Sequence, residues 1–555
     1  MNRWARNRLC GYWKSPYAWL VLALILAAGL KTWLIIGEWA PFNADEAVVA
    51  LMARHILRGE LPVFFYGQAY MGSLDACLIA SGFWLFGEQV WVIRLVQSLL
   101  YLGFLMTTFA LGRLAFNDRR VGAIAILLLA LPPVNLTLYT TVSLGGYGEV
   151  LLLGNLTLIS VLQIWRSFQE GRFPGQRRWW LLVGLSSGLG LWAFGLTLVY
   201  SLPAGVFLFI LTWKALRAAS PPSRRGITWA FCLAVMGSLI GSTPWWLFAL
   251  QNGVTQLLKE LGGEAIAGVE GLPWGVQLVT HTFNLLVFGS TAAIGVRPPW
   301  GVIWLGLPIL PFVLFFWMAV LVYLGRSLSN HPQAPVLWLL AGVIGTLALG
   351  FILTPFGVDS SGRYFLPWAA PLALLAADFI LSIRGRVGLW AFTLVGLLMM
   401  YQLWGVLQSA LRYPPGLTTQ FYAPTQVDQR YMPELITFLR DHGEWRGYTN
   451  YWVAYPLAFL SNEKLIYTPR LPYHLDFRYT RRDDRYPPYD TLVAQAERTA
   501  YITTNHPQLN QRLRQEFRAL GVSWQETTIG DFQVFYALSR AVHPEELGLG
   551  ETTHP

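Results

Sequence analysis

Two adjacent carboxylates, Asp45 and Glu46, follow the first long apolar run of the chain. A carboxylate at the edge of a lipid bilayer costs several kcal/mol when it is desolvated and unpaired, so this pair calls for a role. One role is helix capping, because Asn43 lies three residues before Glu46, as in a capping box, and acidic groups suit the positive end of a helix dipole. The other role is catalysis, with Asp45 as a general base or as a group that orients an acceptor hydroxyl. The two roles are compatible, since a cap also fixes the side chain.

Arg363 and Tyr364 stand in the stretch SGRYFLPW, just before a late apolar run. A guanidinium is the preferred partner of a phosphate, because its planar fork makes two parallel hydrogen bonds. The alternative is an ordinary interfacial arginine beside an aromatic-belt tyrosine. Arg94, near the start of the second apolar run, is a third candidate for the phosphate. It could equally pair with Asp45 or Glu46, or serve as an interfacial anchor.

Polar and aromatic residues also gather in two segments that we expect on the same side as Asp45. They are candidates for lining a sugar or acceptor site. Asp75 could equally be a buried residue that pairs with a neighbouring helix, and Glu149 could simply be an acidic residue at the start of a helix. The predicted substrate-binding residues are Tyr66, Gln68, Tyr70, Asp75, Tyr147 and Glu149. No His, Asp or Glu cluster has the spacing of a dedicated metal site.

The composition indicates the elements that hold these residues. The chain has 555 residues, of which 54% are hydrophobic and only 13% are charged. A soluble protein would have roughly a quarter charged residues, so we predict a polytopic α-helical membrane protein. The net charge of +10 does not indicate nucleic acid, because Lys and Arg fall mainly in short loops between apolar runs. The three cysteines have neither metal-ligand nor disulfide spacing.

Apolar runs long enough to cross a bilayer recur as far as about residue 411. We expect about eleven transmembrane helices, and external loops at 37–90 and 251–299. Loop 37–90 has two apolar runs, 47–57 and 69–86, which are typical of interfacial helices. The predicted spans are 18–36, 91–112, 121–139, 148–165, 179–195, 197–213, 227–250, 300–324, 335–354, 364–382 and 388–408.

The basic residues predict the orientation of these spans. With the N-terminus in the cytoplasm, the basic loops fall on one side, and the opposite loops are nearly free of Lys and Arg. An odd number of spans then places Asp45, Arg363 and the C-terminal segment together on the extracytoplasmic side. Fusing the runs 179–195 and 197–213 would reverse everything after them. The basic positions are Arg113, Arg119, Arg120, Arg166, Arg172, Arg177, Arg178, Lys214, Arg217, Arg224, Arg225, Arg326, Arg384 and Arg386.

From about residue 413 the composition changes, and more than half of the acidic residues lie beyond this point. Helical periodicity appears at 432–441, and short strand-like runs appear at 448–451, 464–467, 500–503 and 532–537. We therefore predict a transmembrane domain at 1–412 and a small extracytoplasmic α/β domain at 413–555.

Together these features resemble the GT-C fold, and specifically the polyprenyl-phosphate-dependent transferases of glycosyltransferase family 39. That family includes protein O-mannosyltransferases and bacterial lipid A aminoarabinose transferases. The resemblance covers essentially residues 1–410 and rests on the acidic pair, on Phe86-Gly87 followed by Arg94, and on the R-Y-x-x-P pattern at 363–367. One departure is the sequence GQAYMG at 67–72, where many relatives have His-Pro-Pro. This departure argues against protein O-mannosylation.

The resemblance implies a transferase that moves a sugar from a polyprenyl phosphate to an extracytoplasmic lipid, glycan or protein, with inversion. Asp45 would deprotonate or orient the acceptor hydroxyl, and Glu46 would support the site or bind the sugar. Arg363, with Tyr364 and Arg94, would stabilise the lipid phosphate as charge develops on it. No cofactor is obligatory in this scheme, and a divalent metal ion at the acidic site is left open. The expected location is the plasma (inner) membrane, with no nucleic-acid partner.

Two other classes of protein compete with the transferase. A transporter or flippase of lipid-linked saccharides would also use arginine for phosphate, but transporters usually place polar sites at the membrane midplane within repeated halves. Here the polar groups crowd one side and no internal repeat is visible. The second competitor is a non-catalytic envelope assembly protein, in which Asp45 and Arg363 are only structural.

Overall fold

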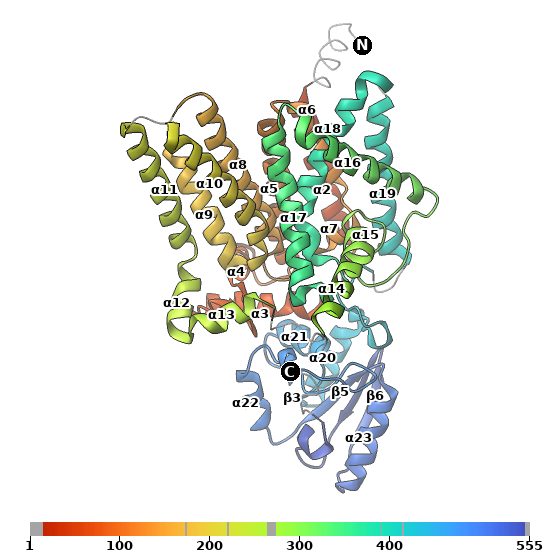
Figure 1. Ribbon diagram of the computed structural model, residues 1–555. Helices are drawn as coiled ribbons and strands as arrows, with labels where there is room; N and C mark the ends of the chain where they lie inside the picture. Colours follow the sequence, from red (N-terminus) through yellow and green to blue (C-terminus); the bar gives the residue numbers. More distant parts are fainter. Residues whose placement is uncertain are drawn as a thin grey trace.

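The computed structural model describes residues 15–172, 175–218, 221–263, 273–388, 390–412 and 416–549. A bundle of long helices forms one part of the molecule, and a smaller α/β domain built from the C-terminal residues lies against one end of it (Figure 1). Short helices lie at the junction between the two parts.

Within the described residues, eight helices are long and apolar enough to span a bilayer, judged by length and composition. A ninth candidate is the pair α11 (Pro221–Gly241) and α12 (Thr243–Asn252), which is bent by 62°. The protein is therefore a multi-pass membrane protein. The eight helices are α2 (Pro16–Ile36), α5 (Val90–Phe116), α8 (Tyr147–Gln169), α10 (Leu198–Ala218), α16 (Leu310–Asn330), α17 (Ala334–Leu353), α18 (Ala369–Val387) and α19 (Trp390–Arg412).

Span 300–324 was predicted to begin too early, since the residues before α16 are turns and coil and the helix begins only at Leu310. The two remaining predicted spans fall on shorter helices. Span 121–139 is divided into α6 (Arg119–Ala130) and α7 (Val134–Tyr139), because two prolines at 132–133 cannot continue the first helix. Span 179–195 is α9 (Arg177–Ala193), which has 17 residues and packs against α8 and α11. The 3-10 turn η1 (Gly195–Thr197) separates α9 from α10, so the two runs are not fused.

The polar loop after α2 forms the junction with the C-terminal domain. Helix α3 (Ala44–Leu57) lies across the end of the bundle (Figure 1) and packs against α4 (Leu74–Phe86) and against the C-terminal domain. The prediction of one helix over 69–86 is wrong at its start, where β1 (Phe64–Phe65) and β2 (Gln68–Gly72) pair as a hairpin. Gly72 lets the hairpin lie close to the residue Trp192, because a Cβ atom at position 72 would lie only 2.2 Å from the carbonyl oxygen of Trp192.

The second external segment is also built from short helices. They are α13 (Val254–Leu261), α14 (Trp274–Phe283), the π-helical turn η2 (Asn284–Gly289) and α15 (Ser290–Ala293). Residues 264–272 of the predicted loop 251–299 lie outside the described residues. After α17 come two 3-10 helices, η3 (Pro355–Val358) and η4 (Arg363–Trp368), and η4 leads into α18.

The C-terminal domain is the predicted α/β unit. Its five-stranded sheet has the order β4-β3-β5-β7-β6, in which β3 is parallel to β4 and β5 while β7 is antiparallel to β5 and β6. Helix α21, which is almost entirely buried, packs between this domain and α3. The strands are β3 (Arg446–Tyr448), β4 (Ile466–Thr468), β5 (Ala500–Thr504), β6 (Gln525–Ile529) and β7 (Phe532–Tyr536), and the helices are α20 (Met432–Asp441), α21 (Tyr451–Leu460), α22 (Pro488–Ala494) and α23 (Pro507–Ala519), with 3-10 turns η5 (Ala423–Thr425), η6 (Gln429–Tyr431), η7 (Arg481–Asp483) and η8 (Pro544–Leu547).

Candidate active site

The acidic pair occupies the first turn of α3, and the predicted cap is present. The Asn43 side chain accepts a hydrogen bond of 3.0 Å from the backbone N–H of Glu46. Successive helical residues point about 100° apart, so the two carboxylates face different surroundings. Asp45 is partly exposed, whereas Glu46 is completely buried. Capping and a chemical role for Asp45 are therefore compatible in this geometry.

Glu46 is held by Arg94, which is itself buried on α5. Nε and Nη2 of Arg94 donate to the two carboxylate oxygens at 3.2 and 3.1 Å, a bidentate pair. Burial raises the pKa of Glu46, while Arg94 and a backbone hydrogen bond from Ser143 act against that rise. Glu46 and Arg94, both predicted from sequence as site residues, thus bind each other. The guanidinium fork of Arg94 is occupied by Glu46.

Asp75 and Glu149 lie next to this ion pair. Asp75 accepts hydrogen bonds from Gln97 Nε2 at 2.7 Å and from Ser143 Oγ at 2.6 Å. Burial raises the pKa of Asp75, and these hydrogen bonds oppose the rise. Glu149, buried in the first turn of α8, interacts electrostatically with Asp75. We call Glu46, Arg94, Asp75 and Glu149 the buried acidic cluster.

Asp45 is contacted from the C-terminal domain. The hydroxyl of Tyr451, the first residue of α21, donates to Asp45 Oδ1 at 2.5 Å. Tyr451 was not among the residues predicted from sequence, because nothing local distinguishes it from the other tyrosines of this domain. Asn450 caps α21 by accepting from the Trp452 N–H at 3.1 Å, which fixes the position of Tyr451.

Arg363 is positioned by a tight turn before η4. Gly362 adopts a φ of 84°, and its carbonyl accepts a hydrogen bond of 2.9 Å from Asn135 on α7. The Arg363 Nε pairs with Asp359 Oδ2 at 2.6 Å, and Nη2 donates to the Tyr364 hydroxyl at 3.2 Å. The side chain keeps 34% of its surface exposed, so part of its fork is open to a ligand.

Tyr70 connects Arg363 with Asp45. Its hydroxyl, on β2, interacts electrostatically with Arg363, Asp45 and a second arginine, Arg485. Burial raises the pKa of Tyr70, and the charges of the two arginines oppose part of that rise. Tyr139 on α7 likewise interacts with both Arg363 and Asp45. Asp45 and Arg363 are therefore both near Tyr70 and Tyr139, whereas Glu46 of the acidic pair turns to Arg94 instead.

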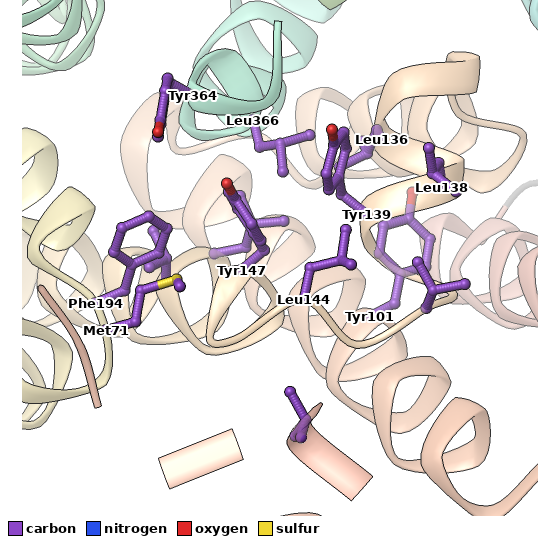
Figure 2. Close-up of a cluster of buried hydrophobic side chains, with 14 of the residues drawn as sticks. Met71, Tyr101, Leu136, Leu138, Tyr139, Leu144, Tyr147, Phe194, Tyr364 and Leu366 are labelled. Atoms are coloured by element: carbon purple, nitrogen blue, oxygen red, sulfur yellow. The ribbon is translucent and has the colours of Figure 1, made fainter. Parts of the chain in front are cut away.

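Aromatic rings line the bundle side of this space. The ring centroids of Tyr139 and Tyr147 are 5.2 Å apart, and Tyr147 meets Phe194 edge-on at 5.1 Å. Figure 2 shows these rings and Tyr364 among buried apolar side chains, with hydroxyl groups of several tyrosines between them. Flat rings with hydroxyl edges suit the mixed apolar and polar faces of a sugar.

An apolar cavity adjoins Tyr364. It has a volume of about 140 Å³, and its lining includes Tyr70, Phe194 and Tyr364 together with residues of α10 and α17. Its walls are almost entirely hydrocarbon and aromatic, so it suits an isoprenoid or acyl chain. Arg363 directly precedes Tyr364 in the chain and donates to its hydroxyl, so a cation lies next to one wall of this apolar cavity.

Tyr66 and Gln68 contact residues of the C-terminal domain. The Tyr66 hydroxyl bonds His55 Nδ1 at 2.9 Å, and its ring stacks on Tyr486 of the C-terminal domain. Gln68 faces Arg485. Over the described ranges, no group of three or more His, Cys, Asp or Glu is placed to hold a metal ion. Arg485, like Tyr451, comes from the C-terminal domain and was missed from sequence.

Comparison with known proteins supports the fold. No family model matches the chain. A curated relative, the undecaprenyl phosphate-alpha-4-amino-4-deoxy-L-arabinose arabinosyl transferase of Edwardsiella ictaluri, is 24% identical over 361 residues, which cover 63% of this chain. The match spans only 57% of that relative's length.

Two solved structures have similar architecture. ArnT from Cupriavidus metallidurans, solved with undecaprenyl phosphate, superposes with a TM-score of 0.57 and 14% identity, covering 93% of this chain and 98% of that chain. The archaeal oligosaccharyltransferase AglB from Archaeoglobus fulgidus, solved with an inhibitory peptide and a dolichol-phosphate, has a TM-score of 0.51 and 14% identity, covering 88% and 69%. Likeness at this identity concerns the fold, and the chain accordingly has the GT-C fold that the sequence resemblance predicted.

Proposed function

We propose that this protein is a membrane glycosyltransferase that moves a sugar from a polyprenyl-phosphate donor to an acceptor hydroxyl. One observation carries the proposal: a partly exposed carboxylate, Asp45, and a partly exposed guanidinium, Arg363, act on the same buried tyrosines beside an apolar cavity. A transferase of this class requires a base, a phosphate-binding cation and a site for a lipid chain. The relatives named above, a transferase and a structure with bound undecaprenyl phosphate, support the same reading.

In the proposed reaction the donor chain occupies the apolar cavity and its phosphate lies against Arg363 and Tyr364. The sugar lies between this phosphate and Asp45, along the wall formed by Tyr139 and Tyr147. Asp45 takes the proton of the acceptor hydroxyl while that oxygen bonds the anomeric carbon and the bond from carbon to phosphate oxygen breaks. The phosphate leaves with both electrons of that bond, and its added charge is stabilised by the guanidinium.

Attack from the side opposite the leaving phosphate inverts the anomeric centre. Glu46 and Arg94 are positioning residues in this scheme, because each satisfies the other and neither is exposed. Asp75 and Glu149 support the turn after α7 through Ser143. By the positive-inside argument, we place the reaction on the extracytoplasmic side of the plasma membrane.

The proposal is tested in proteoliposomes with a panel of undecaprenyl-phosphate sugars and an envelope lipid extract as the source of acceptors. Wild type is expected to release undecaprenyl phosphate, and Asp45→Asn is expected to lose about 10²–10⁴-fold in rate with folding preserved. Asp441→Asn is the matched control, since Asp441 is an exposed carboxylate far along the C-terminal domain. EDTA is expected to leave the rate unchanged. Movement of the lipid-linked sugar across the bilayer without its cleavage would instead identify a flippase and refute the proposal.

A further inference from the structure

Arg485 is a buried guanidinium that the transfer scheme does not use. It lies between η7 and α22 in the C-terminal domain, with 8% of its surface exposed. Its Nη1 and Nη2 donate to the side-chain oxygen of Gln68 at 2.8 and 2.9 Å, in the amide orientation that satisfies both ends of Gln68. The guanidinium also lies over the rings of Tyr451, at 5.4 Å, and Phe65, at 5.9 Å.

The charge of Arg485 is less well compensated than that of two other buried arginines, Arg54 and Arg94. Arg54 pairs with Glu88 at 2.6 Å, and Arg94 pairs with Glu46 at 3.1 Å. Arg485 has no carboxylate within ion-pair distance among the residues that the structure describes, and its buried Nε has no hydrogen-bond partner there. Asp45 and Asp483 act on it only through longer-range electrostatics. A buried cation without a bonded counter-ion is strongly disfavoured, so an anion brought by a ligand would be bound well.

The surroundings of Arg485 contain a second free donor. When the Gln68 oxygen faces Arg485, its amide nitrogen donates to the Tyr70 oxygen at 3.3 Å. The hydroxyl proton of Tyr70 is then available to a ligand. Arg485 reaches Tyr70 through Gln68, and Arg363 bonds Tyr364, which lines the same cavity as Tyr70, so the two guanidinium groups, one from each domain, lie near the same hydroxyl.

We infer that Arg485 is an anion-binding residue of this site, which holds a phosphate oxygen together with the hydroxyl of Tyr70. The ligand is an oxyanion of the phosphate class. Its source is either the phosphate of the donor lipid, which rests on the proposed function, or an anionic group on the second substrate. In both cases the site is complete only when the C-terminal domain is docked on the hairpin β1–β2, since Gln68 and Gly67 of that hairpin contact Arg485.

Binding to the full-length protein in nanodiscs tests the inference without requiring transfer. The probes are undecaprenyl phosphate, the neutral alcohol undecaprenol, and inorganic phosphate. Arg485→Gln is expected to weaken the binding of undecaprenyl phosphate by about 10- to 100-fold and to leave the affinity for undecaprenol within about twofold of wild type. Arg485→Lys is expected to have an intermediate affinity for undecaprenyl phosphate. Arg478→Gln is the control, because Arg478 is an exposed arginine of the same domain that pairs with Asp476.

The two sources give different results. If Arg485→Gln weakens the binding of inorganic phosphate but not the binding of undecaprenyl phosphate, the anion belongs to the second substrate, and the inference holds in that form. If neither probe is affected while the thermal stability falls, Arg485 only anchors the hairpin and the inference is overturned. The role of Asp45 in transfer would survive that outcome. Should Arg485→Gln fail to fold, Arg485→Lys carries the test, because it keeps the charge but loses the planar fork.

Discussion

The surroundings of Asp45 and the buried acidic cluster are built from the same kinds of residue and differ in how charge is compensated. In the cluster, Glu46 and Arg94 neutralise each other with two hydrogen bonds and are closed to solvent. Around Asp45, by contrast, the carboxylate is hydrogen-bonded by the neutral hydroxyl of Tyr451, and the nearby Arg485 has no carboxylate bonded to it among the described residues. Groups with internal partners hold the fold, and groups whose partners are incomplete are available to a ligand.

Removing one member of the cluster's ion pair gives the largest expected effect. Glu46→Ala leaves the buried guanidinium of Arg94 without a partner, so the free energy of unfolding should fall by about 3–5 kcal/mol. Asp45→Ala should cost less than about 1 kcal/mol, since that carboxylate is partly exposed. Denaturant unfolding of the detergent-solubilised protein measures both. Equal losses of stability for the two variants would break the comparison.

Arg363 provides the next test, because its side chain is partly exposed. Arg363→Ala should raise the KM for the donor by about 10- to 100-fold, and Arg363→Lys should raise it less, since lysine keeps the charge but not the fork. Stability should change little. The readout is donor-dependent release of polyprenyl phosphate, with Arg326→Ala, at an exposed arginine near the C-terminal end of α16, as the control. Identical kinetics in the three forms of residue 363 would remove its phosphate role.

Tyr451→Phe sharpens the comparison on the Asp45 side. The change removes only the hydroxyl that orients Asp45, so kcat should fall by about 5- to 10-fold while the KM for the donor is unchanged. Tyr455→Phe is an informative partner variant, because the Tyr455 hydroxyl bonds the backbone of Asp483 and Arg485 rather than Asp45. A larger effect on kcat at Tyr455 than at Tyr451 would contradict the assignment.

The smallest expected effect is a pH dependence that comes from Asp483, which interacts electrostatically with Arg485 and Asp45. Burial raises the pKa of Asp483 to about 7, with Arg485 lowering it and Asp45 raising it. Since this pKa lies above the ordinary value of 3.8, the folded state binds the proton more tightly, and stability should decline as pH rises from 4 through 7. Between pH 6 and pH 8 the loss should be about 1 kcal/mol, measured by unfolding of the full chain. In Asp483→Asn this part of the pH dependence should vanish, and its persistence would assign it to another group.

Much of the fold follows from local sequence. Hydropathy alone located every long helix of the bundle, because a helix that crosses a bilayer must be apolar along its whole length. The cap at Asn43 and the turn before Arg363 are also local features, encoded within a few residues. The hairpin at β1–β2 was not foreseen, since its strands are too short for alternation to distinguish them from an apolar helix.

The residue types at the site were evident from sequence, but their partners were not. Sequence placed Asp45, Glu46, Arg94 and Arg363 on one side of the membrane, because charged groups at apolar boundaries are few. Only the tertiary structure decided that Glu46 turns inward to Arg94 while Asp45 meets Tyr451. Contacts between α3 and the C-terminal domain join residues about 400 positions apart, and no local periodicity encodes such pairings because they depend on how complete surfaces pack.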